Sequence, residues 1–131
     1  MSDYFTFDIR VYYEDTDFSG NVYHGSYVKF FERSRTEWLR NLGIHHFELA
    51  KQGLAFAVAK MEIDFLKPSH IDDLINIKTR LISISGARIS LEQEAFCRGK
   101  KIASAKLVIA VIDVKGRATR LPKDWKPLFL A

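Results

Sequence analysis

A single segment of helical periodicity, in a chain whose other segments alternate like strands, limits the possible fold most strongly. From residue 27 to residue 42, apolar and small residues recur at steps of three and four, at Tyr27, Phe30, Phe31, Ser34, Trp38 and Leu42. This spacing predicts one long amphipathic helix. Ser26 is a candidate N-cap of that helix, and Gly43 is a candidate stop signal at its C-terminal end.

Strand-like segments lie on both sides of this helix. Residues 4–13 are rich in aromatic and β-branched side chains and predict a first strand. Beyond Gly53, three segments alternate apolar and polar residues and a fourth is almost continuously apolar; these four are 61–65, 75–81, 89–95 and 107–112. A short second helix is expected over residues 45–52, and residues 115–131 are expected to be irregular.

The order of these elements predicts an α+β fold. Tight turns favour antiparallel pairing of the four later strands, so we expect one helix wrapped by an antiparallel sheet of about five strands. The length of 131 residues suits a single domain over residues 1–131. The apolar segment 107–112 predicts a central strand covered on both faces. Because one helix cannot cover both faces, we expect at least a homodimer.

Composition excludes several classes of protein. The lone cysteine, Cys97, allows no intrachain disulfide, and its apolar-polar context favours a small buried side chain over a nucleophile. A net charge of +4 is too small and too interspersed for a nucleic-acid-binding protein. We find no secretory signal, no membrane span and no metal-ligand cluster, and expect a cytoplasmic protein without a cofactor.

The polar segment between the first strand and the helix carries the candidate chemistry. Asp15 and Asp17 stand two residues apart in this loop, and His24 comes just before the predicted helix. The first turn of a helix offers unpaired N–H groups that can stabilise a developing oxyanion. A carboxylate facing such a terminus would suit acyl transfer. Turn formation or helix capping by the same aspartates is the alternative interpretation, and the spacing alone does not decide between them.

The motif that includes these residues resembles a known family. Tyr12-Tyr13-Glu14-Asp15-Thr16-Asp17, followed by Gly20, Val22-Tyr23-His24 and Tyr27, is similar to the hotdog-fold acyl-CoA thioesterases, and most to the Tol–Pal-associated, YbgC-type branch. The resemblance continues through residues 31–37, 58–61, Pro68, 72–73 and 121–123. The more distant 4-hydroxybenzoyl-CoA thioesterases share the aspartate and the glycine but differ at Thr16 and His24, which argues against an aromatic substrate.

The resemblance implies roles for particular residues. Asp17 matches the catalytic carboxylate, as nucleophile or general base. His24 matches the position whose backbone N–H faces the thioester carbonyl, with Gly25 beside it against the substrate. Tyr13 lies next to the site in the matching segment, and Asp15 would pin the loop by hydrogen bonds. The phosphates of coenzyme A need cations, for which the candidates are Lys60, Lys67, Arg88, Arg98, Lys100 and Lys101.

The implied function is hydrolysis of acyl-CoA, with acyl carrier protein as a second candidate acyl donor. A homotetramer is the assembly that the resemblance implies, with the acyl site between the Asp17 loop of one subunit and the strands of another. Two alternatives stay open. One is a hotdog hydratase or dehydratase, and the other is an acyl-CoA- or acyl-carrier-protein-binding accessory protein of a cell-envelope system with little hydrolase activity.

Overall fold

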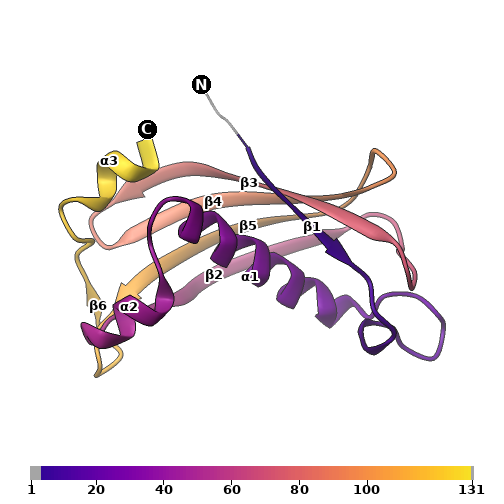
Figure 1. Cartoon of the computed structure of the whole chain (residues 1–131), viewed down its shortest axis with the longest axis horizontal. Helices are drawn as coiled ribbons and strands as arrows, with labels where there is room; N and C mark the ends of the chain where they lie inside the picture. Colours follow the sequence, from indigo (N-terminus) through magenta and orange to yellow (C-terminus); the bar gives the residue numbers. More distant parts are fainter. Residues whose placement is uncertain (1–3, 131) are drawn as a thin grey trace.

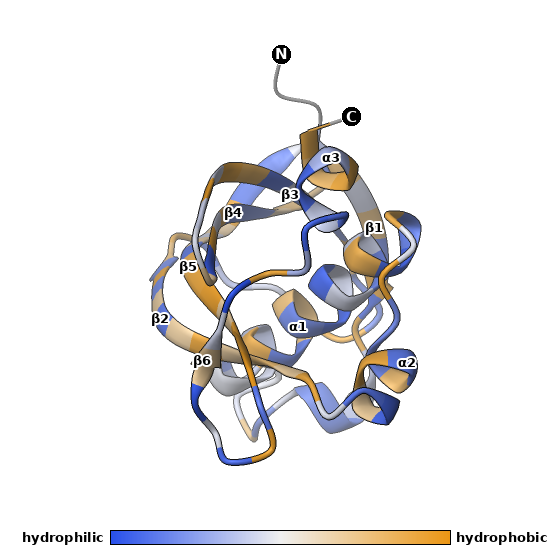
Figure 2. Ribbon diagram, turned by 90° about the vertical axis from the view of Figure 1, so that its left-hand side faces the viewer, coloured by the Kyte–Doolittle hydropathy of each residue, from blue (hydrophilic) through white to orange (hydrophobic). Residues whose placement is uncertain are grey.

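A curved antiparallel sheet wraps around one long helix (Figures 1 and 2). The computed structural model describes residues 4–130, so the ends of the expected domain, 1–3 and 131, lie outside the described residues. The elements in chain order are β1 (Phe5–Arg10), the 3₁₀ turn η1 (Tyr13–Asp15), α1 (His24–Asn41), α2 (His46–Lys51), β2 (Ala55–Phe65), β3 (Leu74–Ser85), β4 (Arg88–Cys97), β5 (Lys100–Ile112), β6 (Ala118–Thr119) and α3 (Trp125–Leu130).

The sheet has the order β1-β3-β4-β5-β2, with the two-residue β6 added to β5. The strands β3, β4 and β5 are joined by hairpins, as predicted. The strand β2 pairs with β5 rather than with β3, so residues 66–73 form a crossover between strands that are not neighbours in the sheet. The expectation that tight turns join all four later strands was therefore wrong for this connection.

The register separates an apolar face from a charged face. Met61, Leu107, Leu91 and Leu81 pair in one row across β2, β5, β4 and β3, and the next row is Glu62, Lys106, Glu92 and Arg80. Because neighbouring positions along a strand point to opposite faces, the first row faces α1 and the second faces away from it. Alternating charges pair across the outer row, where Arg80 Nε donates to Glu92 Oε1 at 2.9 Å.

The prediction of a central strand over residues 107–112 is confirmed. β5 lies between β4 and β2, and the neighbours Ala110 and Val111, which point to opposite faces, are both buried. Cys97 is also buried, as expected, and burial raises the pKa of its thiol. None of the helices within residues 4–130 is long and apolar enough to cross a membrane.

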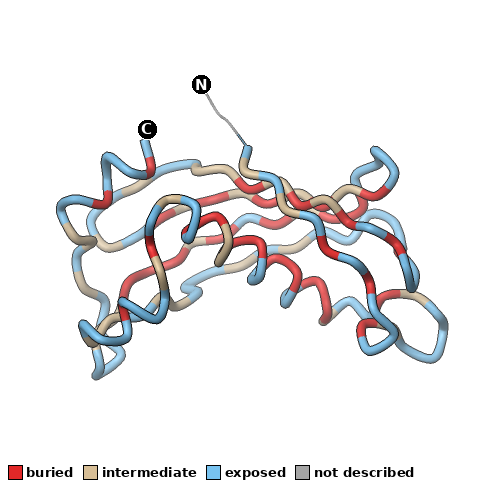
Figure 3. The backbone as a smooth tube through the Cα atoms, in the orientation of Figure 1, coloured by how far each residue is buried: buried red, intermediate tan, exposed pale blue. Residues whose placement is uncertain are grey.

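The helix α1 fills the concave side of the sheet, and its inward face is buried along its length (Figure 3). The stop at Gly43 is confirmed: the helix ends at Asn41, and Gly43 has the positive φ of +89° that glycine adopts most readily. The helix begins at His24, however, three residues before the predicted start. Ser26 is not its N-cap but lies buried in the first turn, where its hydroxyl donates to the Asp15 carbonyl at 3.1 Å.

A buried polar network crosses the interface between α1 and the sheet. Gln93 on β4 is fully buried, and its Nε2 donates to the Phe31 carbonyl at 2.9 Å and to the Thr79 hydroxyl at 3.0 Å. Its Oε1 accepts a hydrogen bond from Arg35 Nη1 at 3.1 Å. Ser34 completes the network through Thr79 at 3.3 Å. These bonds satisfy groups that would otherwise be buried without partners.

Two predictions at the ends of the chain were wrong. The first strand stops at Arg10, because the chain turns into η1 and leaves Tyr12 and Tyr13 exposed. The tail is not irregular: it forms β6 and α3, although Pro127 lies within α3. The aromatic residues of α3 explain its position, since Phe129 packs against Trp38 with ring centroids 5.5 Å apart and Trp125 stacks on Phe56 at 5.6 Å.

Candidate active site

The loop between η1 and α1 is closed by backbone hydrogen bonds at both ends. Thr16 and Val22 form an antiparallel bridge, and Asn21 forms a second one with His70. The tip is a turn in which the Gly20 N–H donates to the Asp17 carbonyl at 3.0 Å, with Gly20 at a φ of +84°. These contacts hold the Asp17 loop (residues 16–22) against residues 66–73, at the end of the molecule where α1 begins (Figure 1).

The Asp17 carboxylate is exposed and is oriented by one neighbour. Its Oδ1 accepts hydrogen bonds from the Ser19 backbone N–H at 2.9 Å and from the Ser19 hydroxyl. The side-chain bond from Ser19 is the largest cause of the lowered pKa of Asp17, followed by the backbone bond from Ser19, with a smaller contribution from His24. Asp17 is therefore ionised at neutral pH, and Oδ2 accepts no hydrogen bond from residues 4–130.

Asp15 has the structural position that the sequence predicted for it. It is buried, and its Oδ2 accepts a hydrogen bond from the Tyr12 backbone N–H at 2.8 Å. Its backbone carbonyl accepts from the Tyr23 N–H at 2.9 Å and from the Ser26 hydroxyl. Asp15 thus fixes the start of α1 relative to the Asp17 loop.

The N-terminus of α1 presents free donors. Tyr23, the N-cap residue, makes no side-chain capping bond. The Ser26 N–H donates to the Tyr23 carbonyl at 2.8 Å, whereas the N–H groups of His24 and Gly25 find no acceptor within residues 4–130. The His24 imidazole packs beside Tyr23 and against Phe65, with ring centroids 4.6 and 5.9 Å away. Two N–H groups and the positive end of the helix dipole are therefore left for a ligand.

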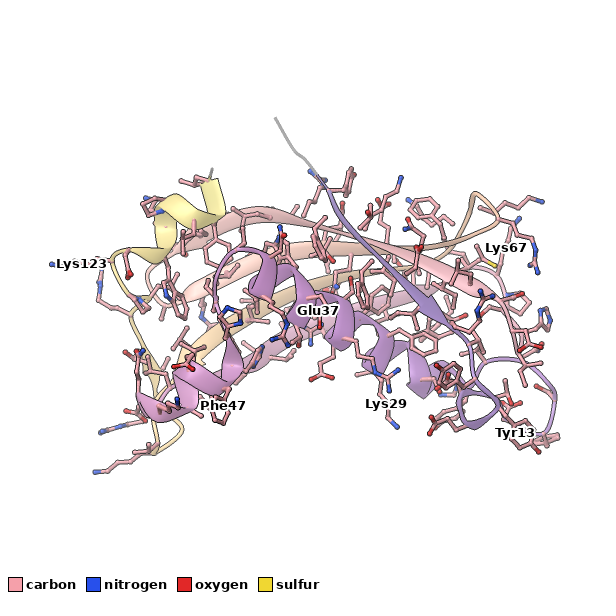
Figure 4. All side chains as sticks on the ribbon, viewed as in Figure 1. Tyr13, Lys29, Glu37, Phe47, Lys67 and Lys123 are labelled. Carbon is pink, nitrogen blue, oxygen red and sulfur yellow. The ribbon has the colours of Figure 1, made fainter. Side chains whose placement is uncertain are left out.

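Asp17 and His24 line the same cleft, which has a volume of about 320 Å³. Its other lining residues are Ser19, Asn21, Val22, Tyr27, Phe65, Leu66, Lys67 and Pro68. Lys67 contributes a cation to the lining of the cleft (Figure 4). Ser19, Phe65 and Leu66 line the cleft although no site role was predicted for them. Ser19 belongs to the Asp17 loop itself, whereas Phe65 and Leu66 reach the site only because the end of β2 and residues 66–73 fold against that loop.

The buried hydroxyl of Tyr27 supports one wall of this cleft. It hydrogen-bonds the Ser69 hydroxyl, and the Ser69 carbonyl accepts from the Val22 N–H at 2.8 Å. Tyr27 is 4% exposed and Ser69 is 1% exposed. Tyr27 belongs to the apolar face of α1, as its spacing predicted, and its hydroxyl also bonds the wall of the cleft.

The other predicted residues near this end lie outside the cleft. Gly25 adjoins His24 in α1. Tyr13 is 81% exposed on η1 and is not part of the lining (Figure 4). The hairpin turn between β4 and β5 also lies at this end (Figure 1). Two of its cations are paired: Arg98 Nη2 lies 2.7 Å from Asp73 Oδ1, and Lys101 pairs with Glu94. Lys100 makes no ion pair within residues 4–130.

Asp73 anchors Arg98 to the connection that lines the cleft. Burial alone raises the pKa of Asp73, but hydrogen bonds from the His70 backbone N–H and from Arg98 lower it below its ordinary value. Two predicted phosphate-binding residues lie elsewhere. Lys60 points to the outer face of the sheet, where it pairs with Glu62 at 3.4 Å. Arg88 is the first residue of β4, next to the turn that joins β3 and β4, at the opposite end of the sheet from the Asp17 loop (Figure 1).

The described part of the chain, residues 4–130, holds no group of three or more His, Cys, Asp or Glu side chains placed to bind a metal ion. The cleft offers an ionised carboxylate, an imidazole and one ammonium group, and the free N–H groups of His24 and Gly25 lie at the helix terminus beside it. A carboxylate facing oxyanion donors suits attack on an activated carbonyl.

Comparison with known proteins places this arrangement in a family. Residues 11–129 match the model of the thioesterase-like superfamily. The chain is 39% identical over 127 residues to the acyl-CoA thioesterase YbgC of Haemophilus influenzae, covering 95% of this chain and 93% of that protein. It is 38% identical to the acyl-CoA thioester hydrolase YbgC of Escherichia coli O6:H1, over 92% of this chain and 91% of that one.

Solved structures of thioesterases have the same fold as this chain. A probable thioesterase from Bartonella henselae superposes with a TM-score of 0.88 at 44% identity, covering 92% of this chain and all (100%) of that one. A DHNA-CoA thioesterase from Staphylococcus aureus has the same fold, with a TM-score of 0.92 at 24% identity over 97% of this chain and 89% of that one. The hotdog fold expected from the sequence is confirmed, and the chain belongs to the thioesterase-like superfamily.

Proposed function

We propose that this protein is an acyl-CoA thioester hydrolase that uses Asp17 as its catalytic carboxylate. The observation that carries the proposal is the cleft in which the ionised, oriented Asp17 lies near the two free N–H groups at the start of α1. The two YbgC relatives, named as acyl-CoA thioesterase and thioester hydrolase, support the choice of substrate.

The reaction needs an attacking group and a site for negative charge. With the thioester carbonyl oxygen directed at the N–H groups of His24 and Gly25, the helix terminus stabilises the oxyanion that forms when the carbonyl carbon is attacked. Collapse of the tetrahedral intermediate breaks the carbon–sulfur bond and releases coenzyme A. Addition of one water yields the free acid, so that acyl-CoA and water become acid and coenzyme A.

Asp17 acts either by direct attack, forming a mixed anhydride that water then cleaves, or by activating water. Asp17 is ionised, and its Oδ2 accepts no hydrogen bond from residues 4–130, so this oxygen is free to attack the carbonyl carbon. This supports direct attack through Oδ2. A single turnover in heavy-oxygen water tests it: label in the Asp17 carboxylate with an unlabelled first product acid shows direct attack followed by cleavage of the anhydride at the Asp17 carbonyl. Label in that first product, with no acyl-enzyme adduct trapped by rapid quenching, assigns Asp17 as a general base instead.

The phosphates of coenzyme A would be held at the end of the molecule where α1 begins. Lys67 lines the cleft and Lys100 lies on the neighbouring hairpin, and neither makes an ion pair within residues 4–130. Arg98 and Lys101 already pair with carboxylates, which makes them weaker candidates for binding the phosphates. Lys60 and Arg88 could serve only through a second subunit, because each lies away from the cleft of its own chain.

Association of subunits belongs to the same proposal. The strand β2 forms an edge of the sheet, and its Val58 and Phe65 are 48% and 50% exposed. A long, partly apolar edge strand is a template for pairing, which supports a homodimer and its further assembly into a tetramer. A stable, active monomer in light scattering would contradict this. An acyl carrier protein is a second acyl donor for the same cleft.

Release of free thiol from acyl-CoA, followed with a thiol reagent across chain lengths and aryl groups, tests the function. We expect steady multiple turnover with at least one acyl-CoA. A protein that binds acyl-CoA without releasing thiol would overturn the proposal and favour the binding-only accessory role. Acyl-pantetheine, which has the thioester but not the nucleotide phosphates, is the matched control. It should show a raised KM and a similar kcat.

A further inference from the structure

A second cavity lies between α1 and the edge strand β2, away from the cleft that contains Asp17. It has a volume of about 150 Å³ and is lined by Glu32, Arg35, Thr36, Leu39, His46, Phe56, Ala57, Val58 and Ile109. Arg35 follows His24 by eleven positions in the same helix, which places it about 16 Å further along the axis. The proposed hydrolase function does not use this cavity.

Arg35 is a buried cation without a carboxylate partner. It is 7% exposed, and within residues 4–130 no Asp or Glu oxygen lies within 4.0 Å of its guanidinium. One nitrogen, Nη1, donates to Gln93. Arginine has five N–H donors, and the remaining ones find no acceptor in the described chain. Within residues 4–130, every side-chain nitrogen or oxygen without a hydrogen-bond partner has some exposure to solvent, and for Arg35 that exposure is to the cavity that it lines.

The guanidinium is held in place on its inner side. Gln93 fixes Nη1 from β4, and Gln93 is itself fixed by the Phe31 carbonyl and the Thr79 hydroxyl. A buried charge is stable only when it is paired or hydrogen-bonded. An arginine that is anchored at one nitrogen and open at the others suits a planar carboxylate, which its fork can bind through two parallel hydrogen bonds.

The walls define the rest of the ligand. Leu39, Phe56, Val58 and Ile109 form an apolar lining, and the Thr36 hydroxyl adds one donor. The volume is well below the ~300 Å³ at which pockets begin to accept drug-sized ligands, so neither coenzyme A nor a long acyl chain fits. Glu32 stands at the wall without pairing with Arg35, and its charge disfavours polyanions such as phosphate esters.

We propose that this cavity is a binding site for a short aliphatic carboxylate, with Arg35 holding the carboxylate and the β2 side of the cavity holding the alkyl chain. Such acids belong to the class of products that thioester hydrolysis yields, but binding here needs no turnover. The site is therefore independent of the proposed hydrolysis, although Val58 in its wall lies on the β2 edge proposed for subunit pairing.

Calorimetric titration of the full chain with butyrate tests the site. We expect saturable binding of one butyrate per subunit, unaffected by saturating coenzyme A, and no binding of butanol, which has a similar size and no charge. Arg35→Gln should weaken butyrate binding by at least about 10-fold, because a charge-assisted pair becomes a neutral one. Absence of butyrate binding, as when a carboxylate of a second subunit already fills the cavity, would overturn the proposal.

A second variant covers the case in which Arg35→Gln does not fold. Val58→Phe fills the cavity from β2 and leaves Arg35 in place, because Val58 pairs with Ile109 on the face of the sheet that points to α1, and it should also abolish butyrate binding. Thermal unfolding of both variants reports whether they fold, and butyrate should raise the Tm of the unmodified protein only. Butyrate affinity that is unchanged in both variants, or that is lost when coenzyme A is added, would place the bound acid elsewhere and refute the site.

Discussion

Loss of the buried hydrogen bond between Tyr27 and Ser69 should destabilise the wall of the cleft in a non-additive way. Both hydroxyls are almost fully buried, so water cannot replace a lost partner. Tyr27→Phe keeps the ring contacts with Phe30 and Phe65 and removes only the oxygen. The Ser69 hydroxyl is then buried without a partner, which costs about 1–3 kcal/mol of unfolding free energy. Ser69→Ala orphans the Tyr27 hydroxyl and should cost about the same.

The double variant removes both polar groups, so neither is left unsatisfied. The double variant should therefore lose less unfolding free energy than the two single variants lose together, by about 1–3 kcal/mol. For a chain of 131 residues, 1 kcal/mol corresponds to roughly 4 °C in Tm. Thermal and urea unfolding of all four proteins, at one fixed concentration, measure the cycle. Losses that add to within about 0.5 kcal/mol would refute the argument that this pair is a coupled, water-free contact.

Three further predictions follow from the charges at this end of the molecule. Ser19→Ala removes the main cause of the lowered pKa of Asp17, so the acidic limb of the kcat/KM profile should move to higher pH; an unmoved limb contradicts the contact. Asp73 has a lowered folded-state pKa because hydrogen bonds outweigh burial, so its stabilisation is complete above the unfolded pKa of about 3.9 and is lost as pH falls through the folded pKa. The unfolding free energy of Asp73→Asn should therefore fall less steeply between pH 5 and pH 2 than that of the unmodified protein. An equally steep fall would exclude this carboxylate as a cause of the loss of stability in acid. Lys67→Gln should raise KM for acyl-CoA more than it lowers kcat, most clearly at low salt, whereas the control Lys123→Gln, at the other end of the molecule (Figure 4), should not.

Periodicity predicted the elements whose burial follows a regular pattern. The long helix forms where apolar residues recur every three or four positions, and the later strands form where apolar and polar residues alternate or where the segment is continuously apolar. The start of α1 was misplaced because Tyr23 caps it without a side-chain bond and Ser26 instead bonds the Asp15 carbonyl. The tail was missed because α3 is short and contains Pro127, and only contacts with distant aromatic rings hold it in place.

The sequence motif brought out the residues of the cleft that are close together in the chain. Asp17 and His24 were predicted from one segment, and the structure places them in one cleft. The cations were harder to predict, because charge alone does not say where a residue lies. Arg88 lies at the wrong end of the sheet for its own cleft, since a strand separates it from the hairpin beside Asp17. Arg35 was overlooked because an arginine within a helix pattern is usually exposed.

Turnover of Asp17→Asn tests the central claim most directly. The substitution keeps the shape and one carbonyl acceptor for Ser19, but removes the charge and the attacking oxygen. Thiol release from the best acyl-CoA should fall at least ~100-fold, the lower range for losing a positioned acid–base group, while coenzyme A binding and Tm stay nearly unchanged. Asp15→Asn, the matched control in the same loop, should lose stability and retain more turnover. Near-normal turnover by a folded Asp17→Asn enzyme would contradict the assignment of Asp17 as the catalytic carboxylate.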